Sequence, residues 1–598
     1  MKAAFLAAAL AVAPAATAYH IDLTRYFATP ATEQSTRVAL IKRIDAFVKA
    51  PPSSLHSPKS LLAWLNHYDG LVKALQRHDI YVYVRSEENS SDHADAAADD
   101  ALGDMADRIH STTSRMLTGI GAKKLNDYMA RTEALARYRF FIATSRAQSA
   151  HESRDPKAEA LLAGPALDSL EDSYKRLRPK PATSTVGNAQ TDAAARAAFN
   201  AKWTPYSRRG EALSAILIPI VKLQNGVAKL HNFPGAPDRI YFDAGLTQVL
   251  VNQTLGAVRA SDSDKRFETI VAQQVARRLG VPIDKVHAWD LSLADSYHPA
   301  ATPFAEAVRD VLAAVRPMGA EYAEQYDALF APRNRRVEWC HARTCDPAGF
   351  SVGFAGSTSG LFYGAYRGTT DNIRAVAHEA GHAVHRQFMN ENQPLAVYNS
   401  GPHFLFESFA IFNGFLLEDY LYRSAKMPAQ KAYYLHRFLD DATFNVYGSA
   451  KETDLEQSIY AGVEKGTIDN AAELDAQTLT VFARYVPPVA LSPAMQAYWA
   501  RDTLYFTDPL YDVNYLFAGL LALNYLRQFE KDPAGFSRHY VALLKNGFTN
   551  SPQAMLEKFL NVDMTDVPGL VKGATTEIDR HATRLGSLYA EARKRRTR

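Results

Sequence analysis

Helical spacing of apolar residues runs through most of this chain and limits what it can fold into. Val38, Ile41 and Ile44 recur at three- and four-residue steps, as they do on the buried face of an amphipathic helix. Ser57-Pro58 then has the residue types of a helix cap followed by a first helical residue. The pattern predicts a mostly α, multi-helical protein in which long helices are joined by short turns.

One segment, residues 347–370, departs from the helical pattern. Its two halves, 347–356 and 361–366, alternate aromatic or aliphatic residues with small ones. The intervening Ser-Thr-Ser-Gly at 357–360 is typical of a turn. The alternation predicts a hairpin or a small β-sheet directly before the next helix.

The size of the chain allows more than one domain. It has 598 residues, of which 47% are hydrophobic, so it buries a core without needing disulfides or a structural metal. The stretch 179–192 is rich in Ser, Thr, Pro and Gly, as a linker or exposed loop is. We therefore expect an N-terminal helical region at 19–195 and a larger region at 196–598. A net charge of +3 gives no reason to expect nucleic acid as a partner.

The N-terminus has the pattern of an export signal. Lys2 supplies a positive charge, residues 3–13 form a short apolar run, and Ala-Thr-Ala at 16–18 matches a cleavage site. We expect a signal peptide at 1–18, cleavage after Ala18, and a periplasmic or secreted protein; the alternative is an Ala-rich first helix. The apolar run is too short for a bilayer core of roughly 30 Å. No later stretch is expected to reach transmembrane length, so no membrane span is predicted.

The chain contains two cysteines, Cys340 and Cys345. An exported chain meets an oxidising compartment, so the C-x4-C spacing predicts a disulfide, with two free thiols as the alternative. A zinc knuckle needs further ligands at fixed spacing, and no second ligand pair follows His341.

The helix expected to start near Thr370-Asp371 contains residues with the spacing of a metal site. His378 and His382 are four residues apart and therefore lie one turn apart on one face. Glu379 is turned by about 100° from His378 and can reach a water without binding the metal itself. This is the H-E-x-x-H pattern of zinc peptidases, in which the glutamate is the general base. Two surface histidines on an amphipathic helix are the alternative.

The surroundings of the motif indicate burial and a third ligand. Residues 375–384 are apolar nearly all round the helix, and buried histidines need partners. Gly381 costs about 1 kcal/mol relative to Ala inside a helix, which indicates close approach by another element. Glu407 stands in the strongly apolar stretch 404–412, where an unpaired carboxylate costs several kcal/mol. A metal bound to Glu407 accounts for it; a buried salt bridge is the alternative.

These residues give the chain a resemblance to a known family. The runs H-E-A-G-H-A-V-H at 378–385, N-E-N-Q-P at 390–394 and E-S-F-A-I-F-N at 407–413 resemble the thimet oligopeptidase and oligoendopeptidase F family of zinc metallopeptidases. The oligoendopeptidase F branch is the closer match. The segment P-L-Y-D-V-N-Y-L-F-A-G at 509–519 resembles the tyrosine segment of that family. The resemblance covers about residues 350–530.

The resemblance implies a fold, a site and an activity. The fold is a mostly helical, two-lobed body around a deep channel that admits unfolded peptides. One zinc ion per chain is implied, bound by His378, His382 and Glu407. Glu379 is the implied general base, and the phenols of Tyr511 and Tyr515 face the reacting carbonyl. The implied activity of the 196–598 region is hydrolysis of internal peptide bonds in short oligopeptides.

Two positions depart from the family pattern, and one histidine has no assigned role. Gly414 stands seven residues after the ligand glutamate, where the family usually has an acidic residue that supports a ligand histidine. The segment R-D-T-L-Y-F-T-D at 501–508 lacks the histidine that the family usually has there; Tyr505 is a candidate substitute. His385 lies on the same face as His382 and either supports a ligand, lines the substrate path or is an ordinary core histidine.

The departures favour one alternative function, a zinc-bound peptide-binding protein without catalytic activity. A metallocarboxypeptidase of another family is a further alternative, since such enzymes share H-E-x-x-H and a later glutamate. End-blocked peptides would resist cleavage by such a carboxypeptidase. A structural helical protein with fortuitous ligands would bind no stoichiometric metal.

Overall fold

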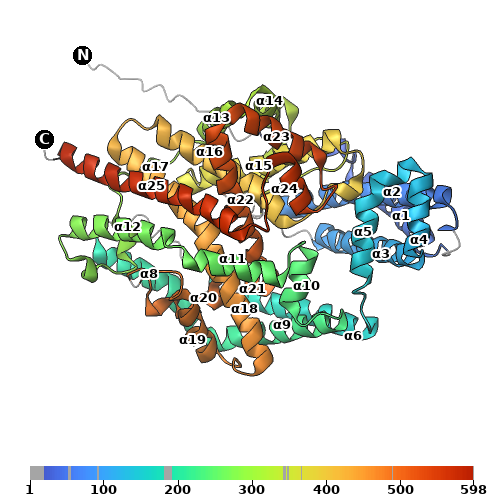
Figure 1. Cartoon of the computed structure of the whole chain (residues 1–598), viewed down its shortest axis with the longest axis horizontal. Helices are drawn as coiled ribbons and strands as arrows, with labels where there is room; N and C mark the ends of the chain where they lie inside the picture. The colour runs from blue at the N-terminus through green and yellow to red at the C-terminus, as the bar shows by residue number, and fades with distance from the viewer. Residues whose placement is uncertain are drawn as a thin grey trace, which may run out of the picture.

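The computed structural model describes residues 19–50, 55–89, 93–180, 191–340, 345, 349–364, 366–487 and 489–596. The expected signal peptide at 1–18 lies outside these residues, as does most of the predicted linker at 179–192. The chain is built almost entirely from helices, as the apolar spacing predicted (Figure 1).

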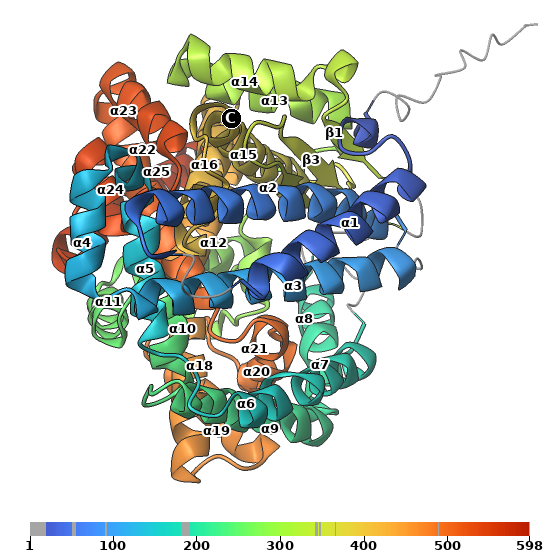
Figure 2. The same cartoon turned by 90° about the vertical axis from the view of Figure 1, so that its right-hand side faces the viewer.

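The first five helices form a group at one end of the molecule (Figure 1). They are α1 (Pro30–Val48), α2 (Pro58–Glu88), α3 (His93–Gly119), α4 (Ala122–Arg131) and α5 (Arg139–Ser149). The predicted start of α2 is confirmed, because the Ser57 hydroxyl accepts a hydrogen bond from the Ser60 backbone N–H at 3.2 Å and Pro58 is the first helical residue. α2 and α3 lie across the face turned towards the viewer in Figure 2.

A middle group of helices follows: α6 (Pro156–Ala163), α7 (Pro165–Leu177), α8 (Asp192–Ser207), α9 (Gly210–Leu230), α10 (Ala236–Asp243), α11 (Gln248–Ala260), α12 (Ser263–Leu279), α13 (Phe304–Val315) and α14 (Ala320–Phe330). In length and composition α9 is able to cross a membrane, so the expectation that no later stretch reaches transmembrane length was wrong. However, 56% of its apolar stretch is buried inside the protein, and a core helix has the same composition.

A small sheet precedes the helix that carries the H-E-x-x-H motif, as predicted. Its strands are β1 (Val337–Trp339), β2 (Gly349–Val352) and β3 (Gly360–Tyr363), in the order β1-β3-β2. β3 pairs antiparallel with β2 and parallel with β1. β1 lies outside the segment predicted to be extended, because a three-residue strand is too short to show an alternation.

The C-terminal helices hold the candidate site. They are α15 (Thr370–Asn392), α16 (His403–Ser424), α17 (Pro428–Thr443), the π-helix η11 (Phe444–Gly448), α18 (Ser449–Lys465), α19 (Ala471–Phe482), α20 (Tyr498–Arg501), α21 (Leu504–Thr507), α22 (Asp512–Lys531), α23 (Pro533–Asn546), α24 (Pro552–Leu560) and α25 (Val567–Arg596). α15 starts close to the predicted position, but its cap is Thr369, whose hydroxyl accepts from the Asn372 backbone N–H at 3.2 Å.

The described residues pack around two hydrophobic cores. One contains side chains from Tyr26 to Ile142 together with a few from the sheet and from the segment after α15. The other extends from Leu167 to Tyr589 and includes the buried faces of α15, α16 and α22. The domain boundary near residue 195 stays a prediction.

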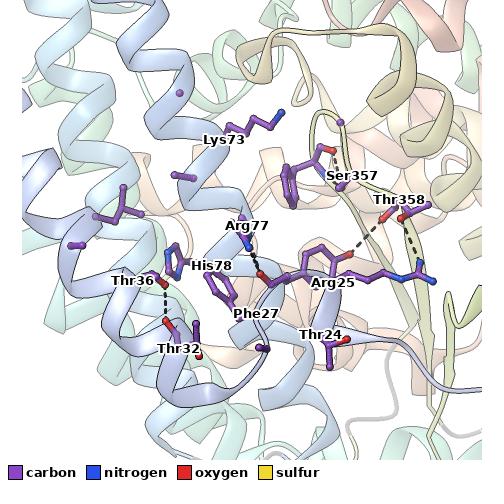
Figure 3. A pocket seen from close by; sticks show the side chains of 18 of the residues that line it. Thr24, Arg25, Phe27, Thr32, Thr36, Lys73, Arg77, His78, Ser357 and Thr358 are labelled. Atoms are coloured by element: carbon purple, nitrogen blue, oxygen red, sulfur yellow. Dashed lines mark hydrogen bonds between the residues drawn. The ribbon is translucent and has the colours of Figure 1, made fainter.

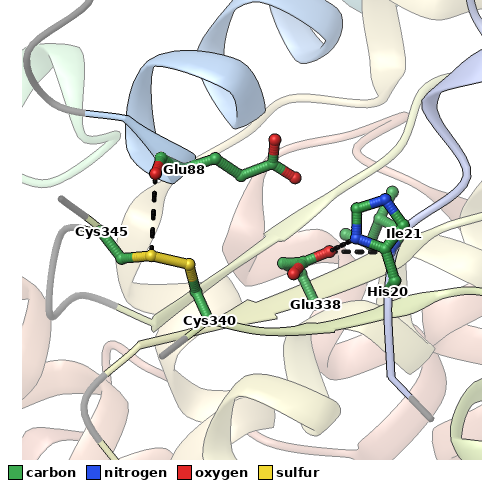
Figure 4. Close-up of a disulfide and its surroundings, with 6 residues drawn as sticks. All are labelled: His20, Ile21, Glu88, Glu338, Cys340 and Cys345. Atoms are coloured by element: carbon green, nitrogen blue, oxygen red, sulfur yellow. Dashed lines mark hydrogen bonds and ion pairs between the residues drawn. A yellow bond between two sulfur atoms is a disulfide. The ribbon is translucent and has the colours of Figure 1, made fainter. Parts of the chain in front are cut away.

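The two cysteines form the expected disulfide, Cys340–Cys345, at the end of β1. Figure 4 shows it beside the C-terminal end of α2, where the Cys345 sulfur is 3.7 Å from the backbone oxygen of Glu88. The bridge therefore lies where the N-terminal helices meet the sheet.

Candidate metal centre

Three predicted ligands from two helices converge on one point. His378 and His382 lie on α15 and Glu407 lies on α16. The Glu407 Oε2 atom is 3.3 Å from His378 Nε2 and 3.7 Å from His382 Nε2. The three ligand atoms lie within 4.8 Å of one another. The structure thus assembles the predicted two-histidine, one-glutamate set.

Close packing of α15 on α16 sets this geometry, and Gly381 permits it. A Cβ at Gly381 would lie 2.8 Å from Nδ2 of Asn413 and 3.1 Å from Cα of Ala410, both on α16. Asn413 is fixed in place, because its Oδ1 accepts hydrogen bonds from the hydroxyls of Tyr322 at 3.0 Å and Tyr326 at 2.6 Å. The close approach predicted from a glycine inside the helix is therefore confirmed.

The charges at the site suit a bound cation. Burial opposes ionisation of Glu407, but the interaction with His378 and the charge of His382 lower its pKa to about 2. Burial lowers the pKa of His382 to about 3, which keeps that imidazole neutral. Burial also acts to lower the pKa of His378, but the contact of His378 with Glu407 prevails and raises the pKa of this histidine. An ionised carboxylate beside a neutral imidazole is the protonation state that binds a metal.

An unsatisfied oxygen supports the same interpretation. Oε2 of Glu407, which both histidines face, accepts no hydrogen bond within the described part of the chain. A buried carboxylate oxygen without a partner is unfavourable unless a cation compensates it. Two imidazole nitrogens and one carboxylate oxygen form a donor set that zinc accepts in catalytic sites. These residues therefore fit the predicted metal.

Glu379 lies next to the ligands and is placed for proton transfer. Burial is the main cause that raises its pKa, to about 7, and the charge of Glu407 acts in the same direction. Gly349 of β2 leaves room for it, because a Cβ there would lie 2.9 Å from Glu379 Cγ. A carboxylate with a pKa near neutrality is able both to accept and to return a proton.

Two cavities adjoin the ligands, and both are lined by His378, Glu379 and Tyr515. The first, of about 520 Å³, also borders α2, β2, His382 and Glu407. The second, of about 540 Å³, extends towards η11, α18 and the segment before α22. Together they give a peptide room on two sides of Glu379.

The two predicted tyrosines lie beside the ligands. The Tyr511 hydroxyl is 3.5 Å from Glu407 Oε1, and the rings of Tyr511 and Tyr515 are 5.4 Å apart. Burial first and the charge of Glu407 second raise the pKa of both phenols above the ordinary value. The Tyr511 hydroxyl thus faces a carboxylate of the site, and Tyr515 lines both cavities.

The sequence interpretation missed one histidine of the site. His403, the first residue of α16, lies with its Nδ1 atom 3.4 Å from the Tyr511 hydroxyl and lines the 520 Å³ cavity. It stands four residues before Glu407 and therefore shares a helix face with it, a spacing that could have identified it. It brings an imidazole near the tyrosine segment from another helix.

The positions left open by the sequence are now placed. Tyr505 does not face the site: it is fully buried and donates to the backbone oxygen of Glu452 at 2.7 Å. His385 is a core histidine, 2% exposed, with its ring 5.0 Å from that of Phe406 and 4.6 Å from that of Phe409.

Gly414 packs against an arginine that carries a carboxylate from another helix. A Cβ at Gly414 would lie 3.5 Å from Cγ of Arg374, and Arg374 pairs with Asp441 of α17 at 3.0 Å. The charge of His378 lowers the pKa of Asp441, although burial prevails and raises it. The carboxylate of Asp441, from α17, thus lies near the ligand His378. Residue 414 itself, where the family usually has an acidic residue, is glycine.

A larger cavity, of about 940 Å³, lies elsewhere, between α1, α2 and the loop at 354–358 (Figure 3). Its basic side chains include Arg25, Lys73 and Arg77, and Arg77 Nε donates to the Tyr26 backbone oxygen at 2.9 Å. It shares no lining residue with the two cavities at the ligands. We do not assign it to the metal centre.

Comparisons with known proteins agree with this site. Residues 368–573 match the model of "Peptidase family M3". Oligopeptidase PepF of Bacillus subtilis is 21% identical over 533 residues, which cover 84% of this chain and 77% of that protein. Group B oligopeptidase PepB of Streptococcus agalactiae is 22% identical over 576 residues, covering 92% and 93%.

Solved structures show the same fold. A putative peptidase from Chlamydophila abortus superposes with a TM-score of 0.73 at 18% identity, over 95% of this chain and 98% of that one. Oligoendopeptidase-F from Enterococcus faecium superposes with a TM-score of 0.67 at 17% identity, over 93% of this chain and 99% of that one. The family match shows a peptidase family M3 domain at residues 368–573, and together with the relatives it supports a metalloendopeptidase of the oligoendopeptidase F branch.

Proposed function

We propose that this protein is an exported, zinc-dependent oligoendopeptidase that cleaves internal bonds of short unfolded peptides. One observation carries the proposal: His378, His382 and Glu407 converge on a point where a buried carboxylate oxygen faces both imidazoles but accepts no hydrogen bond among the described residues. The adjacent Glu379 is exposed to the same two cavities. We propose one zinc ion per chain at this point.

The residues of the chain divide the chemistry among them. Bound zinc supplies Lewis-acid activation of a water and of the scissile carbonyl. Glu379 accepts a proton from the attacking water and later gives it to the nitrogen of the leaving amine. Burial raises the pKa of Glu379 to about 7, and the positive charge of a bound zinc would lower it again.

Hydrogen-bond donors stabilise the negative charge that develops on the carbonyl oxygen. The hydroxyls of Tyr511 and Tyr515 have this role, and His403 orients Tyr511 through the 3.4 Å contact with its hydroxyl. One such donor contributes about 10²–10³-fold to the turnover rate in comparable sites.

The position of the cavities favours short, unfolded substrates. The 520 Å³ cavity is bordered on one side by Gln76, Asp79 and Tyr83 of α2 and on the other by the ligands on α15 and α16. A substrate in this cavity lies between these helices and next to Glu379. An extended peptide segment fits such a space, whereas a folded domain does not.

Export is a separate part of the proposal and rests on the N-terminal sequence alone. The residues at 1–18 have the charge, apolar run and cleavage pattern of a signal peptide. N-terminal sequencing of the protein recovered from the periplasm or medium tests it. The expected first residue is Tyr19, and an intact Met1 would contradict the proposal.

The decisive experiment is hydrolysis of an internally quenched, end-blocked peptide of about ten residues, with and without a chelator, together with the metal content. Chelator-sensitive internal cleavage, restored by zinc, with one zinc per chain is the expected result. One zinc without cleavage of varied peptides would favour the silent peptide-binding protein. Cleavage only of peptides with a free C-terminus would favour a carboxypeptidase.

A further inference from the structure

A second group of carboxylates lies in the 540 Å³ cavity that His378 and Glu379 also line. Glu452 belongs to α18, Asp502 lies between α20 and α21, and Asp512 is the first residue of α22. Each places a carboxylate oxygen within 4.8 Å of the other two. Like charges held so close repel one another, and either protons or a cation between them relieves the repulsion.

Asp512 has the least compensation of the three. It is 2% exposed, and its Oδ2 atom has no hydrogen-bond partner among the described residues. Burial raises its pKa well above the usual range, and the charges of Asp502, Glu452 and Glu456 raise it further. A buried carboxylate oxygen that accepts no hydrogen bond is unfavourable, so Asp512 favours either a proton or an added donor.

The two arginines that line this cavity are engaged elsewhere. Arg374 pairs with Asp441 at 3.0 Å. The guanidinium carbon of Arg501 lies 5.5 Å from the centre of the Trp203 ring and 5.7 Å from that of Tyr498. Arg501 and Lys451 reduce the negative potential at the cluster, but two positive charges do not neutralise three carboxylates.

Burial also disfavours the charged forms of the other two carboxyls. Burial raises the pKa of Glu452 to about 7 and that of Asp502 to about 6, although Arg501 acts against the shift in both. A positive group placed between these carboxyls would displace their protons and be held by the resulting charges.

The lining of the cavity also contains apolar side chains. Phe444, on the π-helix η11, has 51% of its surface exposed, and Ile411 and Leu504 line the same cavity. η11 is pressed against α22, because a Cβ at Gly519 would lie 2.6 Å from the Asn445 backbone oxygen. A cavity lined by both apolar side chains and carboxylates suits a long aliphatic side chain with a positive end better than a bare metal ion.

We propose that Glu452, Asp502 and Asp512 form a subsite for the side chain of a Lys or Arg residue of the substrate, close to the cleaved bond. The inference rests on the proposed peptidase function and adds a substrate class to it. Proximity to the cleaved bond follows from the cavity, which is continuous between the cluster and the side chains of Glu379 and Tyr515.

The test compares matched end-blocked quenched peptides in which one position at a time is Lys or norleucine, which lacks only the charged amine. At one position near the cleaved bond, kcat/KM for Lys is expected to exceed that for norleucine by about 10–100-fold. In Asp512→Asn this ratio is expected to fall at least about tenfold. The ratio cancels any loss that both peptides share.

Two further variants make the result specific. Asp502→Asn, at a half-buried position outside a helix, is expected to lower the ratio too and replaces Asp512→Asn if that protein does not fold. Asp508→Asn removes an exposed carboxylate outside the cavity and is expected to keep the ratio within about twofold. A ratio near one in the unaltered enzyme at every position, or a ratio unchanged in both cluster variants, would overturn the proposal.

A binding measurement separates this inference from the proposed function. Anisotropy of labelled Lys and norleucine peptides on the Glu379→Gln protein detects the subsite even if no peptide is cleaved. If the protein prefers peptides with a free N-terminal amine over peptides with Lys, and Asp512→Asn removes that preference, the assignment to a side chain would be overturned. If the protein binds a second metal ion per chain and Asp512→Asn loses it, the occupant of the cluster is an ion and not a side chain. That result would also overturn the proposal.

Discussion

Replacing Gly381 with Ala tests whether the packing of α15 on α16 sets the metal geometry. The new Cβ would lie 2.8 Å from Asn413 Nδ2 and 3.1 Å from Ala410 Cα, so about 0.3–0.6 Å more room is needed to reach an ordinary contact of 3.4 Å. Asn413 cannot turn aside easily, because Tyr322 and Tyr326 both donate to its Oδ1. The two helices therefore have to separate.

The expected loss is larger in metal affinity than in stability. Overpacking costs about 1–3 kcal/mol, and the gain in helix propensity offsets about 1 kcal/mol of it. The separation moves Glu407 on α16 relative to His378 and His382 on α15, and metal–ligand distances tolerate only about 0.2 Å. Zinc affinity is expected to fall by about 10–100-fold, by analogy with disturbed ligand support.

Competition with a chromophoric zinc chelator measures this affinity, and thermal unfolding monitors the fold. Gly103→Ala in α3 is the matched control, since nothing lies within 4 Å of its added Cβ. The control is expected to stabilise its helix by about 0.5–1 kcal/mol and to leave zinc binding unchanged. Normal zinc affinity in a folded Gly381→Ala protein would refute the proposed link between helix packing and ligand geometry.

The remaining predictions concern the reacting groups. Glu379→Gln is expected to keep one zinc and to lower kcat by about 10²–10⁴-fold, because it removes the proton acceptor; near-normal turnover in a zinc-loaded sample would contradict that role. Tyr511→Phe and Tyr515→Phe are expected to lower kcat by about 10²–10³-fold with little change in KM, and an effect confined to KM would assign these phenols to substrate binding instead. His403→Ala is expected to lower kcat less than Tyr511→Phe does, and to have little further effect when combined with it; additive losses would show that the two act separately.

Some features of this protein follow from the sequence because they depend on local geometry. A spacing of four residues places His378 and His382 on one helix face wherever that helix is packed. An apolar run around Glu407 similarly identifies a carboxylate that needs a partner. Apolar periodicity predicted the helical fold, and alternation predicted the two strands β2 and β3 of the small sheet.

Other features depend on which distant segments meet, and no local pattern contains that information. α9 has the composition of a membrane helix, yet more than half of its apolar stretch is buried among other elements. Tyr505 stood near the tyrosine segment in sequence but points into the core, whereas His403 reaches Tyr511 from a helix more than a hundred residues earlier.

The carboxylate cluster shows the same limit most clearly. Glu452, Asp502 and Asp512 come from three separate segments, and nothing in the spacing of these residues along the chain indicates a common site.

The sequence alone identified His378 and His382 as candidate metal ligands, because side-chain direction within one helix repeats every 3.6 residues. It identified Glu407 because an apolar helix leaves a carboxylate in need of a partner. Only the packing of whole helices against one another decided what surrounds those ligands.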